Sequence, residues 1–442
     1  NLVTSQSFNP FQCPLSSPQT SGIAKSVRFN LRHQMFPECI ECRGIRRMCG
    51  IDPCPLLSEV RSKLPVVEAT SIDELIGPSP PQLFVGRYGY PDVRAGPSAT
   101  WLPENESGTA PMSTGDPADL FGKSLEEVAA RHANLITGGQ RMEVASASRP
   151  GEMLETTQEI AMAARSVDIE LDFANPIRVG RNPTFDSMST PLGPSGEVLR
   201  AEVVGHASIP RKVDSIAGET DLLATSAVDE LTASSIGEAH ISRLLSSGIL
   251  GRESARRLVP TRWSITATDD ILGKRLWRKV GDLPSIDKVL VYEATYLDNR
   301  FHIILTPGMW AFQMLEAWTR GSLWTDSGQV LGDWEELKPR TKYADRVTGA
   351  YYAARLGVLE HMQSVGRSGA CLIWRDIGEG YWAPVGVWLI RETVREAMKE
   401  EPKRFDSLGQ AINYVAPRIS APNDLTNSWF VRRSQQTRLD SF

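Results

Sequence analysis

Four cysteines gathered on one short segment are the residues best suited to chemistry in this sequence. Their spacing is Cys39-x2-Cys42-x6-Cys49-x4-Cys54. Four thiolates on a short loop match the tetrahedral coordination that Zn²⁺ takes in closed structural sites. The same set of ligands can hold an iron–sulfur cluster. The sequence therefore predicts a metal module over residues 36–65, with zinc as the expected ion and an iron–sulfur cluster as the alternative.

Basic side chains surround these ligands. Between Lys25 and Lys63, eight Lys or Arg residues stand against four Asp or Glu residues. Arg43, Arg46 and Arg47 lie between the second and third cysteines. Such side chains neutralise phosphates, so the module is a candidate DNA contact. The alternative is a solvated basic face that binds nothing.

Residues 86–97 form the most unusual loop that the sequence predicts. Three glycines, two prolines, two tyrosines and two arginines follow an apolar segment, 83–85, that we expect to be a buried strand. Arg87 and Arg94 could grip a phosphate, and Tyr88 could stack on a base. The loop matches neither a Walker sequence nor a dinucleotide fingerprint. It predicts either a structural glycine-rich corner or the wall of a pocket for a nucleotide or nucleic acid.

A second basic stretch covers residues 252–279. Its candidate phosphate contacts are Arg256, Arg257 and Arg262. A helix that includes Ile241, a turn at Gly248 and a further helix from Arg252 would resemble a helix–turn–helix, whose second helix meets a DNA groove. The alternative is a packed pair of helices with charged outer faces.

The last residues of the sequence place Gln436, Leu439 and Phe442 at positions i, i+3 and i+6. These positions coincide on one side of a 3₁₀ turn, which would present a small apolar plug beside a hydrogen-bonding amide. The pattern resembles the motif by which replication and repair proteins dock on the sliding clamp PCNA. Such motifs commonly end in two adjacent aromatics, whereas one aromatic stands here, so we expect weaker docking.

No catalytic set emerges from the sequence. The six histidines form no HExxH motif, and no nucleophile–base pair or paired metal-binding carboxylates are evident. Cys371 lies in an apolar run and is expected to be a buried core thiol. The catalytic residues, if the body is an enzyme, stay unknown at this level.

Composition limits the class of protein. A hydrophobic content of 41% can fill a sizeable core, and no run of eighteen apolar residues predicts a membrane span. A net charge of −5 excludes a uniformly basic coat, so any DNA-binding surface must be local.

Strands and helices alternate without a regular βαβ repeat, which favours an α+β (mixed α/β) body. Strands are expected at 83–85, 198–206 and 370–375, with a hairpin over 288–306. Helices are expected at 124–136, 151–166, 219–233, 237–247, 342–364, 387–399 and 407–415, and one more after Asp269-Asp270. The predicted domains are an extended arm at 1–35, the metal module at 36–65, the body at 66–417 with a possible sub-boundary near 210–290, and a flexible tail at 418–442.

Four stretches together resemble the archaeal Nre family of DNA repair proteins. They are the cysteine segment from Cys39 to Leu57, the segment from Phe84 to Pro91, the segment from Leu258 to Thr266, and the terminal Gln436/Leu439/Phe442. The resemblance covers about residues 36–442 and implies an archaeal, cytoplasmic and nucleoid-associated protein that resists DNA damage through PCNA. It carries the metal ligands to the four cysteines and the clamp contacts to the three terminal residues.

Three functional hypotheses follow. The first is a DNA repair protein that PCNA recruits to DNA and that touches DNA through local basic surfaces. The second is an enzyme that processes nucleic acid or a nucleotide in a pocket at the 86–97 loop. The third is a non-catalytic scaffold whose cysteine module binds protein.

Overall fold

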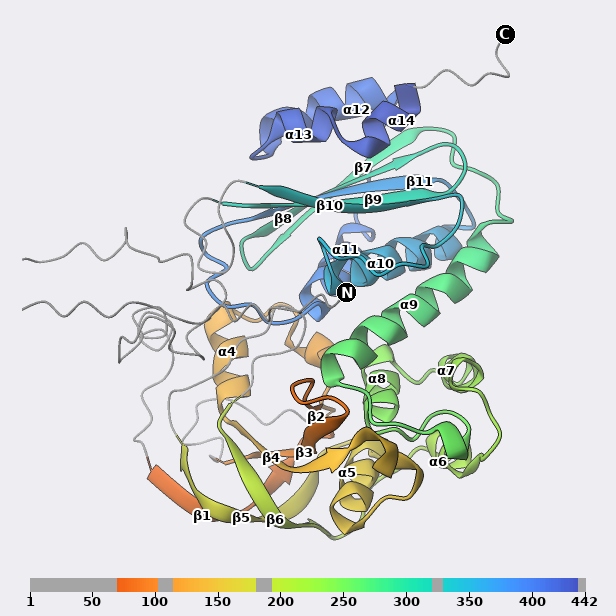
Figure 1. The fold of residues 1–442 in the computed structure, drawn as a ribbon. Helices are drawn as coiled ribbons and strands as arrows, with labels where there is room; N and C mark the ends of the chain where they lie inside the picture. The colour runs from red at the N-terminus through yellow and green to blue at the C-terminus, as the bar shows by residue number, and fades with distance from the viewer. Residues whose placement is uncertain (1–69, 102–113, 180–192, 320–328, 436–442) are drawn as a thin grey trace, which may run out of the picture. The chain divides into compact units, whose positions relative to one another are not determined.

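The computed structural model describes residues 70–101, 114–179, 193–319 and 329–435 (Figure 1). They form two six-stranded sheets with helices packed on them, so the prediction of a mixed α/β body is confirmed. The N-terminal arm, the four-cysteine segment and the terminal motif lie outside the described residues. None of the described helices is both long and apolar enough to cross a membrane.

The first sheet has the strand order β1-β5-β6-β4-β3-β2. Its strands are β1 (Thr70–Ser79), β2 (Leu83–Val85), β3 (Asp92–Thr100), β4 (Leu135–Glu143), β5 (Val167–Val179) and β6 (Ser195–Val204). Only β4 and β6 run parallel, and the other neighbours are antiparallel. The predicted buried strand at 83–85 is therefore confirmed as a short edge strand.

Helices of the middle of the chain pack beside the first sheet (Figure 1). They are α4 (Leu125–Ala133), α5 (Glu152–Met162), α6 (Arg211–Gly218), α7 (Ala224–Ala233) and α8 (Glu238–Ser246). Helix α4 begins with a capping box, in which Ser124 and Glu127 satisfy each other's backbone amides. Val93 and Leu154 join residues of α6 to α8 in one buried cluster.

The second sheet has the order β10-β9-β11-β8-β7-β12. Its strands are β7 (Val289–Tyr296), β8 (Asn299–Thr306), β9 (Ala311–Trp318), β10 (Val330–Glu336), β11 (Ala370–Ile377) and β12 (Lys403–Phe405). The predicted hairpin over 288–306 is confirmed as β7–β8, with its turn at Leu297 and Asp298.

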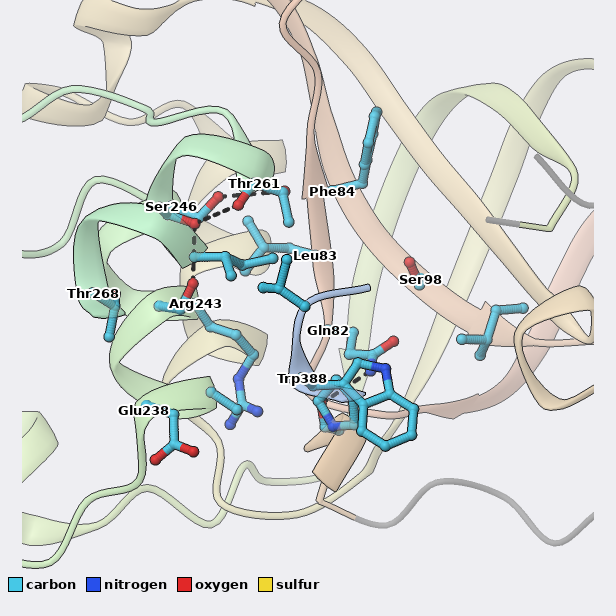
Figure 2. Close-up of a pocket in the computed structure, with 18 of the residues that line it drawn as sticks. Gln82, Leu83, Phe84, Ser98, Glu238, Arg243, Ser246, Thr261, Thr268 and Trp388 are labelled. Carbon is cyan, nitrogen blue, oxygen red and sulfur yellow. Dashed lines mark hydrogen bonds between the residues drawn. The ribbon is translucent and has the colours of Figure 1, made fainter. Parts of the chain in front are cut away.

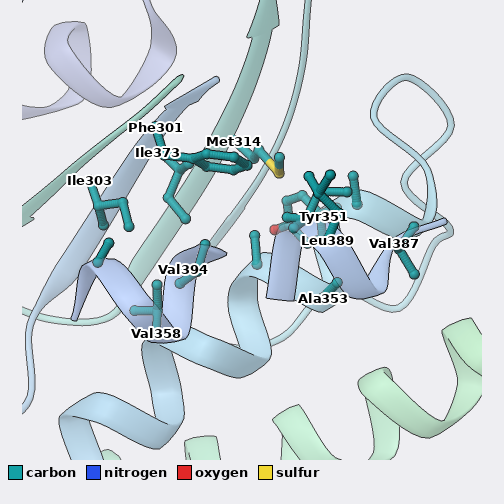
Figure 3. Packing of buried hydrophobic residues seen from close by; sticks show 14 of the residues in the cluster. Phe301, Ile303, Met314, Tyr351, Ala353, Val358, Ile373, Val387, Leu389 and Val394 are labelled. Carbon is teal, nitrogen blue, oxygen red and sulfur yellow. The ribbon is translucent and has the colours of Figure 1, made fainter. Parts of the chain in front are cut away.

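Both faces of the second sheet are covered by helices (Figures 1 and 3). Helices α10 (Gly349–Val365) and α11 (Trp388–Ala397) cover one face, and α12 (Leu408–Val415), α13 (Pro422–Thr426) and α14 (Trp429–Gln435) cover the other. Successive residues of β11 point to opposite faces, so Cys371 and Ile373 meet α10 and α11 while Leu372 meets α12. Burial raises the pKa of Cys371, which confirms the expected core thiol.

The flexible tail predicted from residue 418 does not begin there. Residues 422–435 form two helices, and Leu425, Phe430 and Val431 are buried against the second sheet. The Phe430 amide also donates a hydrogen bond to Gln313 Oε1 on β9 at 2.8 Å. The segment looks polar in the sequence because only a few apolar residues make its contact with the body.

Helix α9 (Thr261–Val280) joins the two halves of the body, since it packs against α8 and α10. Asp269 and Asp270 lie inside this helix and do not precede it, as the sequence had suggested. Gly248, with a φ of 73°, follows the end of α8 as expected. The next element is a three-residue 3₁₀ turn, Glu253–Ala255, so the helix expected from Arg252 was wrong and no helix–turn–helix forms there.

Candidate functional site

The loop expected at 86–97 is a short turn, because β3 begins at Asp92. Arg87 and Tyr88 lie on this turn, with the Arg87 guanidinium 5.0 Å from the centre of the Tyr88 ring. Arg94 instead lies within β3, where its Nη1 reaches Ser195 Oγ at 3.5 Å. Burial lowers the pKa of Arg94, only partly offset by the nearby carboxylate of Glu197. The turn, and not the strand that follows, carries the exposed groups.

The structure places this turn against the first turn of α9. The Val85 amide donates to Thr261 Oγ1 at 2.9 Å, and the rings of Tyr90 and Trp263 are 5.3 Å apart. The exposed fractions are 68% for Tyr88, 50% for Tyr90 and 44% for Trp263. We call these three rings, with Arg87, the aromatic patch. It joins the predicted turn to the second basic stretch through Trp263, which the sequence named only within the segment from Leu258 to Thr266. Arg262 precedes Trp263 in the first turn of α9.

The other predicted phosphate contacts are distributed differently. Arg256 donates to the backbone carbonyls of Ala217 at 2.9 Å, Glu219 at 2.7 Å and Gly251 at 3.2 Å, so its guanidinium holds a turn together. Arg257 is exposed and bonds to the carbonyl of Arg256. Arg43, Arg46 and Arg47, like the cysteines between which they lie, are outside the described residues.

A cavity of about 110 Å³ lies beside β2, the strand that precedes this turn (Figure 2). Its walls come from β2, β3 and β4 on one side and from α8, α9 and α11 on the other. Gln82, Leu83 and Phe84 line it, and Ser98 does so from β3, but none of residues 86–97 contributes. Residues 86–97 therefore do not form the wall of this cavity, which was one of the two alternatives for that loop.

Small hydroxyl side chains dominate the polar part of this cavity. They are Ser98, Thr137, Ser242, Ser246, Thr261, Ser264 and Thr268. Some are paired, since Ser242 Oγ and Ser264 Oγ are 3.1 Å apart and Ser246 Oγ donates to the Val259 carbonyl at 2.8 Å. The Thr268 hydroxyl is buried and has no hydrogen-bond partner among the described residues. The lining thus offers donors and acceptors to a small polar ligand.

An ion-pair network closes one end of the cavity. Arg391 donates to Asp269 Oδ1 at 2.7 Å and lies 3.0 Å from Glu238 Oε1, which also pairs with Arg395 at 2.7 Å. Burial raises the pKa of Asp269 to about 6, although Arg391 opposes the rise. Burial acts in the same direction on Glu238, but Arg391 and Arg395 outweigh it and lower the pKa of Glu238 to about 2. Asp269 Oδ2 has no hydrogen-bond partner in the described part of the chain.

Arg243 differs from these arginines because no carboxylate pairs with it. Only 9% of the residue is exposed, and its Nη1 and Nη2 donate to the carbonyls of Thr114 at 3.1 Å and Ala163 at 3.3 Å. Its Nε has no hydrogen-bond partner, and no Asp or Glu oxygen lies within 4.0 Å, among residues that the structure describes. Burial lowers the pKa of Arg243 to about 10, and the carboxyl group of Asp116 offsets this only in part.

One further acidic group has the spacing of a cation site. The carboxylates of Glu74, Glu170 and Asp172 lie within 4.8 Å of one another. Arg200 Nη1 is 3.9 Å from both Glu170 and Asp172, so a guanidinium offsets part of the charge of this exposed cluster. We assign no metal to it.

Sequence reasoning missed the cavity. Its charged residues Arg243, Asp269 and Arg391 come from three helices that are far apart along the chain. The tandem Asp269-Asp270 was noticed only as a helix start. A local sequence pattern cannot predict a group of residues that only helix packing brings together.

The fold and site thus define a mixed α/β protein with a partly open cavity, in which hydroxyl and charged groups stand among apolar surface, and an exposed aromatic patch. Two family models match the chain: "Archaeal Nre, N-terminal" over residues 48–325 and "Archaeal Nre, C-terminal" over residues 335–442. The chain belongs to the archaeal Nre family, as its motifs had indicated.

Three relatives are named DNA repair proteins. NreA of Archaeoglobus fulgidus is 33% identical over 91% of this chain and 98% of its own length. NreB of the same organism is 33% identical over 92% of this chain and 100% of its own length. NreA of Haloferax volcanii is 34% identical over 79% of this chain and 84% of its own length. No solved structure matches the fold.

Proposed function

We propose that this protein acts in DNA repair in an archaeal cell. The observation that carries the proposal is the identity of 33–34% to proteins named for DNA repair, which extends over most of both chains. A role in the cytoplasm, at the nucleoid, follows from such a function. Deletion of the gene should sensitise the host to DNA-damaging agents, and the full-length gene should restore resistance. Unchanged survival after several classes of damage would contradict the proposal.

The terminal Gln436, Leu439 and Phe442 are proposed to recruit the protein to PCNA. Their spacing supports this, and the helix before them, α14, ends at Gln435 in contact with the body. A chain that ends at Gln435 should keep its unfolding midpoint and lose binding to the host clamp in a calorimetric titration. Leu439→Ala should weaken binding, whereas Ser441→Ala, outside the i, i+3, i+6 set, is the matched control. Equal affinities for all four proteins would exclude clamp recruitment.

DNA contact is proposed at the aromatic patch and at the arginines of the cysteine segment. Exposed aromatic rings stack on unpaired bases, and neighbouring arginines grip the backbone. Binding to single-stranded DNA should weaken steeply as salt is added, because releasing bound counterions into a more concentrated salt solution is less favourable. Binding that ignores salt, or that requires a protein partner, would favour the alternative of a protein-binding scaffold.

The cysteine segment is proposed to hold zinc through Cys39, Cys42, Cys49 and Cys54, with an iron–sulfur cluster as the alternative. A closed four-thiolate zinc site would stabilise the segment without supplying catalysis. Elemental analysis of protein purified without added metal should give one zinc per chain. Iron together with visible absorption would indicate an iron–sulfur cluster. If the protein contained neither zinc nor iron, the segment would not be a metal module.

A second candidate function is an enzyme that processes nucleic acid or a nucleotide in the cavity. Asp269 supports it, because a buried carboxyl group with one unbonded oxygen and a pKa raised to about 6 by burial suits general acid–base chemistry. Asp269→Asn should then abolish turnover of a nucleotide or damaged DNA while PCNA binding persists. If the native protein turned over none of these substrates, the enzyme hypothesis would be wrong and the cavity would serve binding alone.

A further inference from the structure

Three of the residues that line the cavity each carry a buried polar atom that protein atoms leave unsatisfied. Arg243 Nε, Thr268 Oγ1 and Asp269 Oδ2 are each buried without a hydrogen-bond partner among the described residues, and all three residues line the same space. A buried polar group without a partner costs free energy, so it is ordinarily matched by water or a ligand. A space of about 110 Å³ exceeds what a single water needs. The cavity is therefore built to be occupied.

Arg243 determines the charge of the occupant. A guanidinium has five N–H donors, and here the described partners are two backbone carbonyls, which carry no charge. Glu238 and Asp269 line the same cavity and pair with Arg391 and Arg395, although Asp269 Oδ2 has no further partner among the described residues. A buried cation without a paired anion is costly, and an anionic ligand would relieve that cost.

The rest of the lining determines the chemical class. Ser246 and Ser264 already donate their hydroxyl protons to backbone carbonyls. The Thr268 hydroxyl is unpartnered among the described residues, and the hydroxyls of Ser242 and Thr261 have only neighbouring hydroxyls to donate to, so these three can turn to the oxygens of a phosphate monoester. Leu83, Phe84 and Trp388 add apolar and aromatic surface, which suits an organic substituent on that phosphate. Figure 2 shows Arg243 and Glu238 on the helical side and Gln82 and Leu83 on the strand side.

We propose that this cavity binds a phosphate monoester, with Arg243 as the contact to the phosphate and Thr268 and the neighbouring hydroxyls as further donors. The inference rests on the proposed repair function for the two molecules that could supply the phosphate monoester. In a DNA repair protein, a phosphate monoester comes from a free nucleotide or from the 5′-phosphate end of a broken strand. Both present the same dianionic group to Arg243.

Calorimetry on the full-length protein tests the proposal with four probes: a deoxynucleoside 5′-monophosphate, the same deoxynucleoside without phosphate, and one short oligonucleotide with a 5′-phosphate or a 5′-hydroxyl. The monophosphate should bind and the deoxynucleoside should not. A preference for the 5′-phosphate oligonucleotide assigns a strand end, and equal binding of both oligonucleotides with binding of the monophosphate assigns a free nucleotide. If phosphate improves the binding of neither probe, the proposal is wrong.

Arg243→Gln should weaken binding of the preferred probe by roughly tenfold or more, since it removes a charged hydrogen-bond donor. Arg256→Gln is the matched control, because Arg256 also bonds to backbone carbonyls but does not line the cavity. Equal loss in both variants would contradict a direct contact.

Thr268→Val supplies a second test that does not depend on the folding of the Arg243 variant. The hydroxyl has no partner among the described residues, so its removal should leave the unfolding midpoint of the empty protein unchanged or raised. The substitution should weaken binding of the preferred probe several-fold. Unchanged affinity for that probe would show that Thr268 does not contact the ligand. PCNA and single-stranded DNA binding, measured on the same variants, should persist, so failure of this inference is separable from failure of the repair function.

Discussion

Asp269 and Arg391 form a buried ion pair in which Arg391 Nη1 donates to Asp269 Oδ1 at 2.7 Å. Asp269 comes from α9 and Arg391 from α11, so the pair ties the helix that joins the two halves of the body to the helical layer of the second sheet. Both side chains are almost entirely buried. The pair therefore contributes to the fold and borders the cavity at the same time.

Arg391→Met should lower the free energy of unfolding by about 3–5 kcal/mol, because it leaves the buried carboxylates of Asp269 and Glu238 without their shared cation. Urea unfolding followed by circular dichroism measures this. Arg404→Met is the control, since its ion pair with Glu401 is solvent-exposed and should matter little. A similar loss in both variants would contradict the role of burial.

The stability of the protein should depend on the protonation of Asp269. Its pKa is raised from 3.8 to about 6 by burial, with Arg391 and Arg395 opposing and Glu238 and Glu360 reinforcing the rise. The folded state then binds this proton more tightly than the unfolded state does, so the contribution of Asp269 to stability grows as pH falls from about 6 towards 4. It diminishes as pH rises through the same range.

The comparison with Asp269→Asn isolates this effect, because the amide does not titrate. The native protein should gain, relative to the variant, on the order of 2–3 kcal/mol between pH 7 and pH 4. Glu238, whose pKa is lowered to about 2, acts with the opposite sign and only at more acidic pH. Parallel pH profiles for the two proteins would show that Asp269 has an ordinary pKa.

Trp263→Ala should weaken binding to single-stranded DNA by about 1–3 kcal/mol, since the ring is 44% exposed and packs beside Tyr90 in the aromatic patch. Fluorescence anisotropy with a labelled oligonucleotide measures the affinity. Trp334→Ala is the control, because Trp334 is similarly exposed but lies on β10 outside the patch. Affinity that falls only in the control would place the DNA contact elsewhere.

Phe430→Ala should lower the free energy of unfolding by about 3–5 kcal/mol, because the ring is 2% exposed and fills the layer between α14 and the second sheet. Arg432→Ala changes an exposed position of the same helix and should leave stability nearly unchanged. Thermal unfolding monitored by circular dichroism compares the two. No effect of either substitution would restore the view that residues 418–435 form a flexible tail.

Much of the fold could be predicted because its cause is local. The capping box at Ser124 and Glu127, the strand of Cys371 between apolar neighbours, and the β7–β8 hairpin all carry their signals within a few residues. The prediction failed where distant contacts decide. Phe430 lies in a mostly polar segment, and only its contact with the second sheet makes that segment part of the body.

The sequence by itself determined the family, because the order of its motifs, from the cysteine segment to the last residue, can be recognised without knowing where they lie in space. It also nominated Arg87, Tyr88 and Arg262 as nucleic-acid contacts. Only the tertiary structure decided that Trp263 joins them and that Arg256 is engaged with backbone carbonyls. It alone assembled Arg243, Thr268 and Asp269 around one cavity, because helix packing joins residues whose spacing along the chain carries no period.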